Sequence, residues 1–244
     1  MHNWIETCVE HHEICAGRKV NQLPNRVLEI DGEHVYLREH LRNTAMYACL
    51  SHCWGQSGPT LKLDKASSRH FFDGILSIDY QRPLQTLLIC VQDLVFALSG
   101  LMPAVSCPRQ SICTQLKCVY SGIMQDDKDD WKEAAATMAM TYEQAHLTIA
   151  ATWASDSDCG LFASDREPYK ARKLQDHELY IHTDGPVFPP PAAVGWTEFP
   201  LLSRAWVYQE RLLSSRMVHF GKDQVSHRRS LLLEICIFQI PKHS

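Results

Sequence analysis

The stretch at residues 123–152, IMQDDKDDWKEAAATMAMTYEQAHLTIAAT, constrains the fold most because all of its local signals agree. Asp130 is placed to cap a helix that opens at Trp131, and Glu133 follows three residues later, as a capping box requires. Apolar residues then recur at steps of four and three along one helical face: Trp131, Ala135, Met138, Tyr142 and Ala145. Residues 147–152 read as a short strand of small residues. The sequence therefore predicts a helix that leads into a buried strand.

Composition narrows the classes of protein to consider. The chain has 244 residues, of which 45% are apolar and 21% charged, as in a globular protein with one good core. A formal net charge of −4 provides no basic field, so we expect no nucleic-acid partner. No apolar run approaches roughly 18 residues, and the first residues are polar rather than a secretion signal. We therefore expect a cytoplasmic protein without a membrane span.

Ten cysteines raise the question of a metal site or a disulfide framework. Residues 8–15 hold two cysteines and two histidines, and Cys49 and Cys53 are four positions apart, but neither group has a second pair at zinc-finger spacing. Without a secretion signal, reduced and partly buried thiols are the better interpretation. We expect no metal and no cofactor.

Apolar patterns predict further strands. Residues 26–30 and 34–38 alternate polar and apolar around an Asp-Gly turn, which indicates a hairpin near an edge of the sheet. Residues 46–55, MYACLSHCWG, form a nearly continuous apolar run that is typical of a strand buried on both faces. Short strands are also expected at 178–182 and 217–220, and helices within 1–20 and 64–72. Residues 84–98 would form a buried helix if the segment 84–122 is taken as it stands. The residues after 225 show no pattern that would complete a sheet.

Ser51, His52 and Cys53 are predicted at the C-terminal end of the strand in 46–55, the end that faces the ligand crevice in open α/β sheets. Adjacent strand residues point to opposite faces, so Ser51 and His52 are poorly placed to form a nucleophile and its base. A catalytic triad is defined by geometry, and we do not expect these three residues to form one.

Residues 200–213, PLLSRAWVYQERLL, predict a second helix. Ser203 fits the N-cap position, and Trp206, Gln209, Glu210 and Leu213 share a helical face. A face that mixes tryptophan with amide and carboxylate groups is more often a structural hydrogen-bonding face than a catalytic one.

Four blocks together resemble the heterokaryon incompatibility (HET) domain of filamentous fungi: ACLSHCWG (48–55), the stretch at 123–152, CGLF (159–162) and PLLSRAWVYQERLLSSRMVHFG (200–221). LPNRVLEI (23–30) fits the segment that precedes this domain. Blocks in the family's order over well over half of the chain are a specific signal. The residues that match the family's motifs are Ser51, Cys53, Trp54, Gly55, Gln125, Asp126, Asp127, Trp131, Glu133, Ala134, Tyr142, Ala145, Thr148, Gly160, Leu161, Phe162, Ser203, Arg204, Trp206, Gln209 and Glu210.

The resemblance implies an effector of self/non-self recognition that triggers programmed cell death. Because the sequence shows no metal, phosphate-loop or triad signature, our first hypothesis is that it acts through assembly with protein partners rather than as an enzyme. A suggested distant similarity of this domain to TIR domains implies a single layered α/β domain whose mostly parallel, flavodoxin-like central sheet is flanked by helices. We divide the chain accordingly into an N-terminal helix and hairpin region (1–45), the HET domain (46–225) and a tail outside the family (226–244).

The similarity to TIR domains leaves an alternative, a hydrolase of NAD or another nucleotide. Such an enzyme needs a carboxylate in a crevice, and the acids near well-formed elements are Glu210, Asp126 and Asp127. Asp126 and Asp127 are more readily interpreted as a solvated turn that approaches a helix.

Residues 84–122 depart from the family pattern, because the expected strand before residue 123 is missing. Among these 39 positions only Asp93, Arg109 and Lys117 are charged, and no amphipathic period persists after residue 99. We hypothesise that this segment is translated out of frame beside an unspliced intron. The sheet would then lack one central strand, its neighbours would be left unpaired, and the product would be unstable or non-functional. A mature transcript that encodes these residues in frame would end the hypothesis.

Overall fold

Strand β5 (Tyr47–Ser51) lies at the centre of the main sheet, and all five of its side chains are buried. The prediction of a strand buried on both faces, drawn from the apolar run, is therefore confirmed. The computed structural model describes residues 21–31, 34–39, 44–56, 58, 62–76, 117–119, 123–157, 159–161, 172–173, 180–181, 199–221, 225–229 and 235–238.

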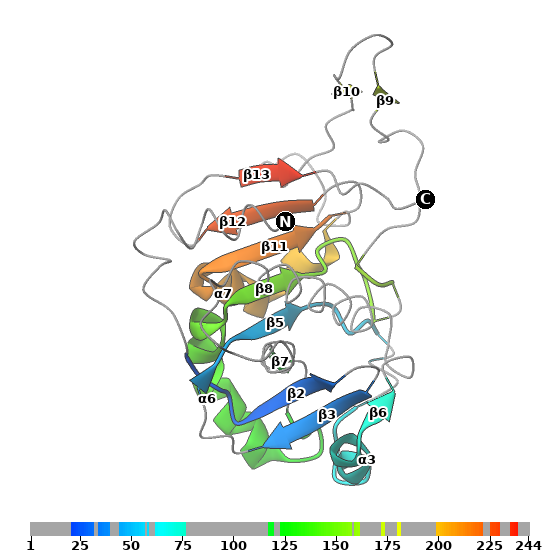
Figure 1. Cartoon of the computed structure of the whole chain (residues 1–244), viewed down its shortest axis with the longest axis vertical. Helices are drawn as coiled ribbons and strands as arrows, with labels where there is room; N and C mark the ends of the chain where they lie inside the picture. Colours follow the sequence, from blue (N-terminus) through cyan, green and yellow to red (C-terminus); the bar gives the residue numbers. More distant parts are fainter. Residues whose placement is uncertain are drawn as a thin grey trace, which may run out of the picture.

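The main sheet contains nine described strands, shown in Figure 1. Their spatial order is β13 (Ile235–Phe238), β12 (Val225–Arg229), β11 (Arg216–Phe220), β8 (Leu147–Ala150), β5, β7 (Lys117–Val119), β2 (Arg26–Asp31), β3 (His34–Glu39) and β6 (Ile75–Leu76). Two small antiparallel pairs lie outside it: β1 (Asn21–Gln22) with β4 (Thr44–Ala45), and β9 (Arg172–Lys173) with β10 (Tyr180–Ile181).

The sheet is mixed, which corrects the expectation of a mostly parallel, flavodoxin-like sheet. Of the described strands, only the four central ones, β11, β8, β5 and β7, run parallel to one another. The other pairings described in the sheet are antiparallel, on both flanks of this centre. The reason is the connections: the β2–β3 and β11–β12 pairs follow one another with short links, and short links join antiparallel strands.

Strand β7 corrects the expectation that β5 and β8 lack a neighbour. Lys117–Val119 pairs in parallel with β5, so that Tyr47 lies opposite Lys117, and it pairs antiparallel with β2 on its other edge. Strand β8 in turn lies between β5 and β11. A short strand from within residues 84–122 therefore occupies the place of the strand that was expected to be missing. Residues 84–116 and 120–122, which carry the rest of the out-of-frame hypothesis, lie outside the described residues.

The C-terminal part of the chain extends the sheet, contrary to prediction. Strand β12 folds back on β11 from Phe220 opposite Val225, and β13 pairs antiparallel with β12. The short, mixed sequence of β12 gave no clear alternation from which a strand could be predicted. Pairing with β11 supplies the hydrogen bonds that stabilise β12.

Several other local predictions are confirmed. The hairpin at 26–38 forms β2 and β3 close to the β6 edge, and strands form within 147–152, 178–182 and 217–220. The short helix predicted at 64–72 is α3 (Ser68–Asp73). The helices predicted within 1–20 and 84–98 lie outside the described residues.

Helix α6 (Lys128–Gln144) begins earlier than predicted. Its N-cap is Asp127, whose carboxylate accepts hydrogen bonds from the backbone N–H groups of Asp129 and Asp130. The Asp130 carboxylate instead accepts from the Met124 backbone N–H at 2.7 Å and pairs with Arg26. The predicted cap is therefore wrong by three residues, because Asp130 is engaged in tertiary contacts and Asp127 is placed to turn back on the helix.

Helix α7 (Ala205–Leu213) follows a 3-10 turn, η4 (Pro200–Ser203). The predicted cap Ser203 lies in that turn, where its hydroxyl donates to the Pro200 carbonyl, and Arg204 occupies the N-cap position. The helix buries Val207 and Glu210, while Trp206 is half exposed. Of the residues predicted to share one face of this helix, Glu210 is buried, whereas Trp206 and Gln209 are exposed.

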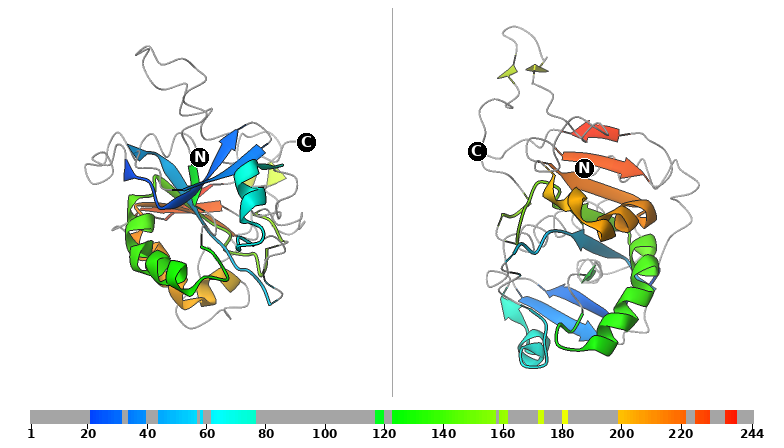
Figure 2. Two further views of the ribbon diagram at one scale, coloured as in Figure 1. Left: turned by 90° about the horizontal axis from the view of Figure 1, so that it is seen from below. Right: turned by 180° about the vertical axis from the view of Figure 1, so that it is seen from behind.

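Helices α6 and α7 lie on the same face of the sheet, as Figure 2 shows. Helix α6 connects β7 to β8, and α7 connects β8 to β11, so both connections move across the sheet in the same direction. Because crossovers between parallel strands are right-handed, two crossovers in one direction place both helices on one face. A core cluster that includes Leu37, Leu50, Ile149 and Phe220 holds the strands together. Each such side chain contributes about 1.5–3 kcal/mol on full burial.

The N-cap of α6 gives a direct test of this local structure. Asp127→Ala should lower the free energy of unfolding by more than a surface change does, because two backbone N–H groups lose their acceptor. Asp129→Ala is the control, since this first-turn carboxylate is exposed and makes only a surface pair with Lys132, so its loss should cost a few tenths of a kcal/mol. Urea denaturation measures both values. Equal values for the two variants would contradict this cap assignment.

Candidate functional site

A pocket of about 410 Å³ lies between the C-terminal end of β5 and the helices α6 and α7. In open α/β sheets ligands bind at the carboxyl ends of strands where successive connections diverge to opposite sides. Here the chain leaves β5 toward β7 and leaves β8 toward β11, so the divergence falls between β5 and β8. The pocket is lined by Pro24, Asn25, Arg26, Leu50, Ser51, His52, Trp54, Ile123, Gln125, Asp130, Trp131, Glu133, Ala134, Ala135, Thr137, Met138, Thr141, Tyr142, Arg204, Trp206 and Glu210.

Glu210 forms the polar floor of this pocket and is 8% exposed. The Ser51 hydroxyl donates a hydrogen bond to Glu210 Oε2, and the Tyr142 side chain also hydrogen bonds to this carboxyl group. Burial, followed by the charge of Glu210, raises the pKa of Tyr142 well above its ordinary value of 10, so its phenol keeps its proton and acts as a donor. Three elements, β5, α6 and α7, thus contribute one side chain each to the floor.

The Arg204 side chain brings a positive charge to the same region. Its guanidinium donates to the backbone carbonyl of His52, just beyond the end of β5. Its charge favours the ionised form of Glu210, as do the hydrogen bonds from Ser51 and Tyr142, but burial outweighs all three and raises the pKa of Glu210 above its ordinary value of 4.5. A carboxyl with a raised pKa exchanges its proton at a higher pH than a surface glutamate, which suits a group that takes part in acid–base catalysis.

Ser51, His52 and Cys53 do not act on one another. Ser51 bonds to Glu210, whereas His52 Nε2 lies 3.5 Å from the Ser157 hydroxyl. Burial and the charge of Arg204 lower the pKa of His52 to about 3, so its imidazole stays neutral at physiological pH. Cys53 packs in an apolar cluster around Val207, and burial raises the pKa of its thiol. Of these three residues, Ser51 is therefore the one whose side chain hydrogen bonds to the pocket carboxyl group, that of Glu210.

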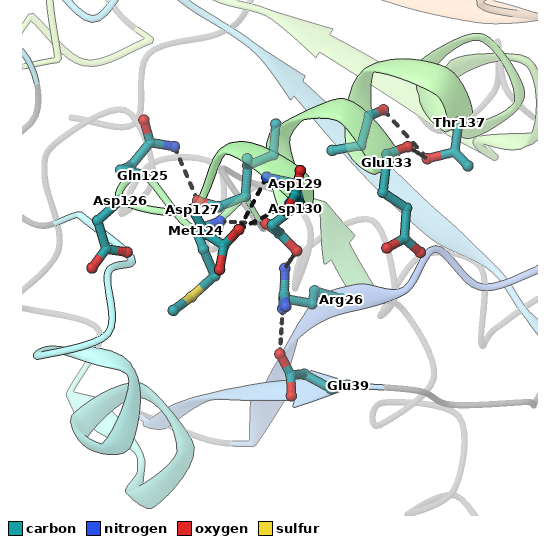
Figure 3. Close-up of polar contacts among 12 residues, drawn as sticks. Arg26, Glu39, Met124, Gln125, Asp126, Asp127, Asp129, Asp130, Glu133 and Thr137 are labelled. Carbon is teal, nitrogen blue, oxygen red and sulfur yellow. Dashed lines mark hydrogen bonds and ion pairs between the residues drawn. The ribbon is translucent and has the colours of Figure 1, made fainter.

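An ion-pair network closes the pocket beside the start of α6, and Figure 3 shows its side chains. Arg26 from β2 pairs with Asp130 at the N-terminus of α6 and with Glu39 from β3. Hydrogen bonding and charge from both carboxylates outweigh burial and raise the pKa of Arg26. The network fixes the first turn of α6 against the sheet, and with it the pocket residues of that turn.

Two of the three candidate carboxylates lie outside the pocket lining. Both Asp126 oxygens accept from the Lys65 backbone N–H, at 3.2 Å each, and Asp127 caps α6 and pairs with Lys65. The approach turn to the helix is thus tied to the segment before α3, in keeping with the interpretation of these acids as a structural turn. Glu210 alone of the three lines the pocket.

The remaining motif residues divide between lining and scaffold. Trp54, Gln125, Trp131, Glu133, Ala134, Tyr142, Arg204 and Trp206 line the pocket with Ser51 and Glu210. Gly55 has a φ of +74°, and a Cβ there would meet Asp156 Cβ at 2.6 Å. Ala145, Thr148 and Leu161 are buried, Gly160 has a φ of +76°, Ser203 lies in η4 and Gln209 is exposed. Phe162 lies outside the described residues.

Sequence reasoning missed the pocket residue that comes from β2 and two threonines of α6. Arg26 is 104 positions from Asp130, and the pattern around it indicates only a strand. Thr137 and Thr141 also line the pocket, although the apolar stripe of α6 gave no reason to single them out. The one available signal was the spacing of Met138 and Tyr142 on a helical face, and both of these line the pocket.

The described part of the chain holds neither a metal-binding cluster nor a membrane-spanning helix. No group of three or more His, Cys, Asp or Glu side chains there could hold a metal ion. Nor does that part contain a helix with the length and apolar character needed to cross a membrane.

The raised pKa of Glu210 predicts a pH-dependent difference between the wild type and Glu210→Gln. Below the ordinary pKa of 4.5 the carboxyl is protonated in both the folded and the unfolded chain. As the pH rises from 4.5 to the raised pKa, only the unfolded chain loses this proton, so the wild type should lose about 1.4 kcal/mol per pH unit relative to the variant. Urea denaturation at pH 4 to 8 measures the stability of the wild type relative to the variant. A relative wild-type stability that stays constant or rises with pH would contradict the burial argument.

Comparison with known proteins found one family model that matches part of the chain. The family model described as Heterokaryon incompatibility protein (HET) matches residues 119–210, from the end of β7 through α6 and β8 to Glu210. No curated protein and no solved structure gave a match. The matched segment supplies most of the pocket walls. Residues 119–210 of this chain are therefore similar to the heterokaryon incompatibility (HET) domain.

Proposed function

We propose that this protein is an effector of self/non-self recognition that triggers programmed cell death in vegetative incompatibility. The family match supports this proposal, and it covers the segment that joins the sheet to the pocket floor. The function would be carried out in the cytoplasm with other proteins as partners, either incompatibility factors or further copies of the chain.

Exposed apolar side chains support an action through protein assembly. Met140 on α6 and Tyr208 and Leu212 on α7 are 48%, 66% and 48% exposed, and none of the three lines the pocket. Large apolar groups on two neighbouring helices favour contact with another protein surface. Assembly would bury these side chains and leave the pocket floor unchanged.

Expression of the full chain in a filamentous fungus tests the effector proposal. We expect induction to reduce the count of viable cells by at least tenfold. The double variant Tyr208→Glu/Leu212→Glu should lose most of this effect and elute later in size-exclusion chromatography, because charges replace the apolar contacts. Lys132→Glu, an exposed change on α6, is the control. Undiminished growth with the wild-type chain would refute the effector role, and killing by the double variant would refute assembly through these side chains.

A second candidate function is the hydrolysis of NAD or another nucleotide. The observation that favours it is Glu210: one buried carboxyl, with a raised pKa, at the floor of a pocket of about 410 Å³ and in contact with Ser51. Water would add to C1′ of the ribose as the C1′–N bond breaks, and the base would leave with the bond's electron pair. Ionised Glu210 would accept a proton from the attacking water or stabilise the positive charge that develops on the sugar.

Nicotinamide release from NAD tests this second candidate. With the purified full chain we expect release that falls by about 100-fold or more in Glu210→Gln, since general acid–base groups contribute about 10²–10⁴-fold. Glu133→Gln is the matched control, because Glu133 also lines the pocket but is exposed. Chromatography of the products measures the rate. Release that survives Glu210→Gln, or no release with the wild type, would eliminate the hydrolase; cell death without release would leave assembly as the mechanism.

A further inference from the structure

Two tryptophans that line the pocket are unusually exposed for such large apolar side chains. Trp131 on α6 and Trp206 on α7 are 53% and 47% exposed, and both line the pocket together with Trp54, which lies beyond the end of β5. An indole in contact with water is poorly placed for the stability of the fold, whereas it offers a broad apolar face to a ligand. Because these three rings come from three different parts of the fold, the tertiary structure brings them together around one volume.

The pocket has an apolar side and a hydroxylated floor. Ile123 and Met138 join the tryptophans in its lining, while the polar groups gather around Glu210, with the hydroxyls of Ser51 and Tyr142 bonded to it. A ligand that matches this arrangement has a planar apolar ring at one end and several hydroxyl groups at the other. Neither a free base nor a free sugar satisfies both ends.

The charges of the lining limit what else the ligand carries. The described lining contains two cationic side chains, Arg26 and Arg204, and three carboxylates, Asp130, Glu133 and Glu210. Arg26 is paired with Asp130 and with Glu39, and the charge of Arg204 acts on Glu210. No surplus positive charge is therefore available in this lining to hold a phosphate group, so any phosphate on the ligand would remain at the solvent side.

We propose that this pocket binds a nucleoside moiety: its aromatic base stacks on Trp131 and Trp206, and its ribose hydroxyls contact the floor at Ser51 and Glu210. The proposal concerns binding at the site for which hydrolysis is the second candidate function, and it rests on that site but does not require turnover. A nucleoside has about 20 non-hydrogen atoms, which suits a pocket of about 410 Å³ at the small end of ligand sites. Stacking of a base on an aromatic side chain contributes about 1–3 kcal/mol.

Isothermal titration calorimetry on the full chain tests this proposal with nicotinamide riboside, adenosine and uridine as ligands and ribose as the ligand without a base. We expect at least one of the three nucleosides to bind at least tenfold more tightly than ribose. Trp131→Ala and Trp206→Ala should each weaken binding of that nucleoside by about 10-fold, whereas Trp131→Phe and Trp206→Phe, which keep an aromatic face, should stay within about threefold of the wild type.

Matched controls separate stacking from a general effect on the protein. Tyr208→Ala and Met140→Ala remove equally exposed apolar groups from the same two helices but outside the pocket, and should change the affinity by less than twofold. Thermal melting compares the fold of all variants. The proposal is overturned if no nucleoside binds more tightly than ribose, or if the alanine variants of the tryptophans bind like the controls. Nucleoside binding without base release would overturn the hydrolase alone, and base release that is insensitive to both tryptophan variants would overturn the stacking proposal alone.

Discussion

Hydrogen bonding along both edges of β5 is the constraint on which the rest of the structure depends. The five residues of this strand are buried, so their backbone N–H and C=O groups have no access to water and need partners on both sides. Strand β8 supplies one side, from Ala48 opposite Leu147 to Ser51 opposite Ala150, and β7 supplies the other. Each missing bond would cost about 1–3 kcal/mol, a large part of the stability of a domain. The three residues of β7 therefore matter more than their number implies.

The position of β5 also determines the site. Its last residue, Ser51, ends at the carboxyl edge of the parallel strands, where the neighbouring connections diverge. Helix α7 then crosses the same face of the sheet and brings Glu210 within hydrogen-bond reach of Ser51. The pocket is thus a consequence of a parallel centre with both crossovers on one face. Antiparallel strands on the two flanks widen the sheet without altering this geometry.

Two buried charged groups, Glu210 and Arg216, are compensated in different ways. Glu210 is compensated by hydrogen bonds and by Arg204, and still has a raised pKa. Arg216, which is 1% exposed, donates from Nε to the His146 carbonyl at 2.7 Å, just after the C-terminal ends of α6 and α7. The carbonyl-rich ends of helices carry partial negative charge and favour a cation there. Burial and the charge of Arg216 lower the pKa of His146 to about 4, so this histidine remains neutral at physiological pH.

The sequence by itself determined the elements whose signal is local. Alternation and the Asp-Gly turn predicted the β2–β3 hairpin, the apolar run predicted β5, and the helical period predicted α6, because each signal lies within a few residues of chain. Only the tertiary structure decided the rest. Strand β7 forms because β5 and β2 flank it, Asp127 caps α6 because Asp130 is engaged by Arg26, and Glu210 meets Ser51 across 159 positions. Contacts at such separations leave no trace in local periodicity, since the sheet order alone sets which residues meet.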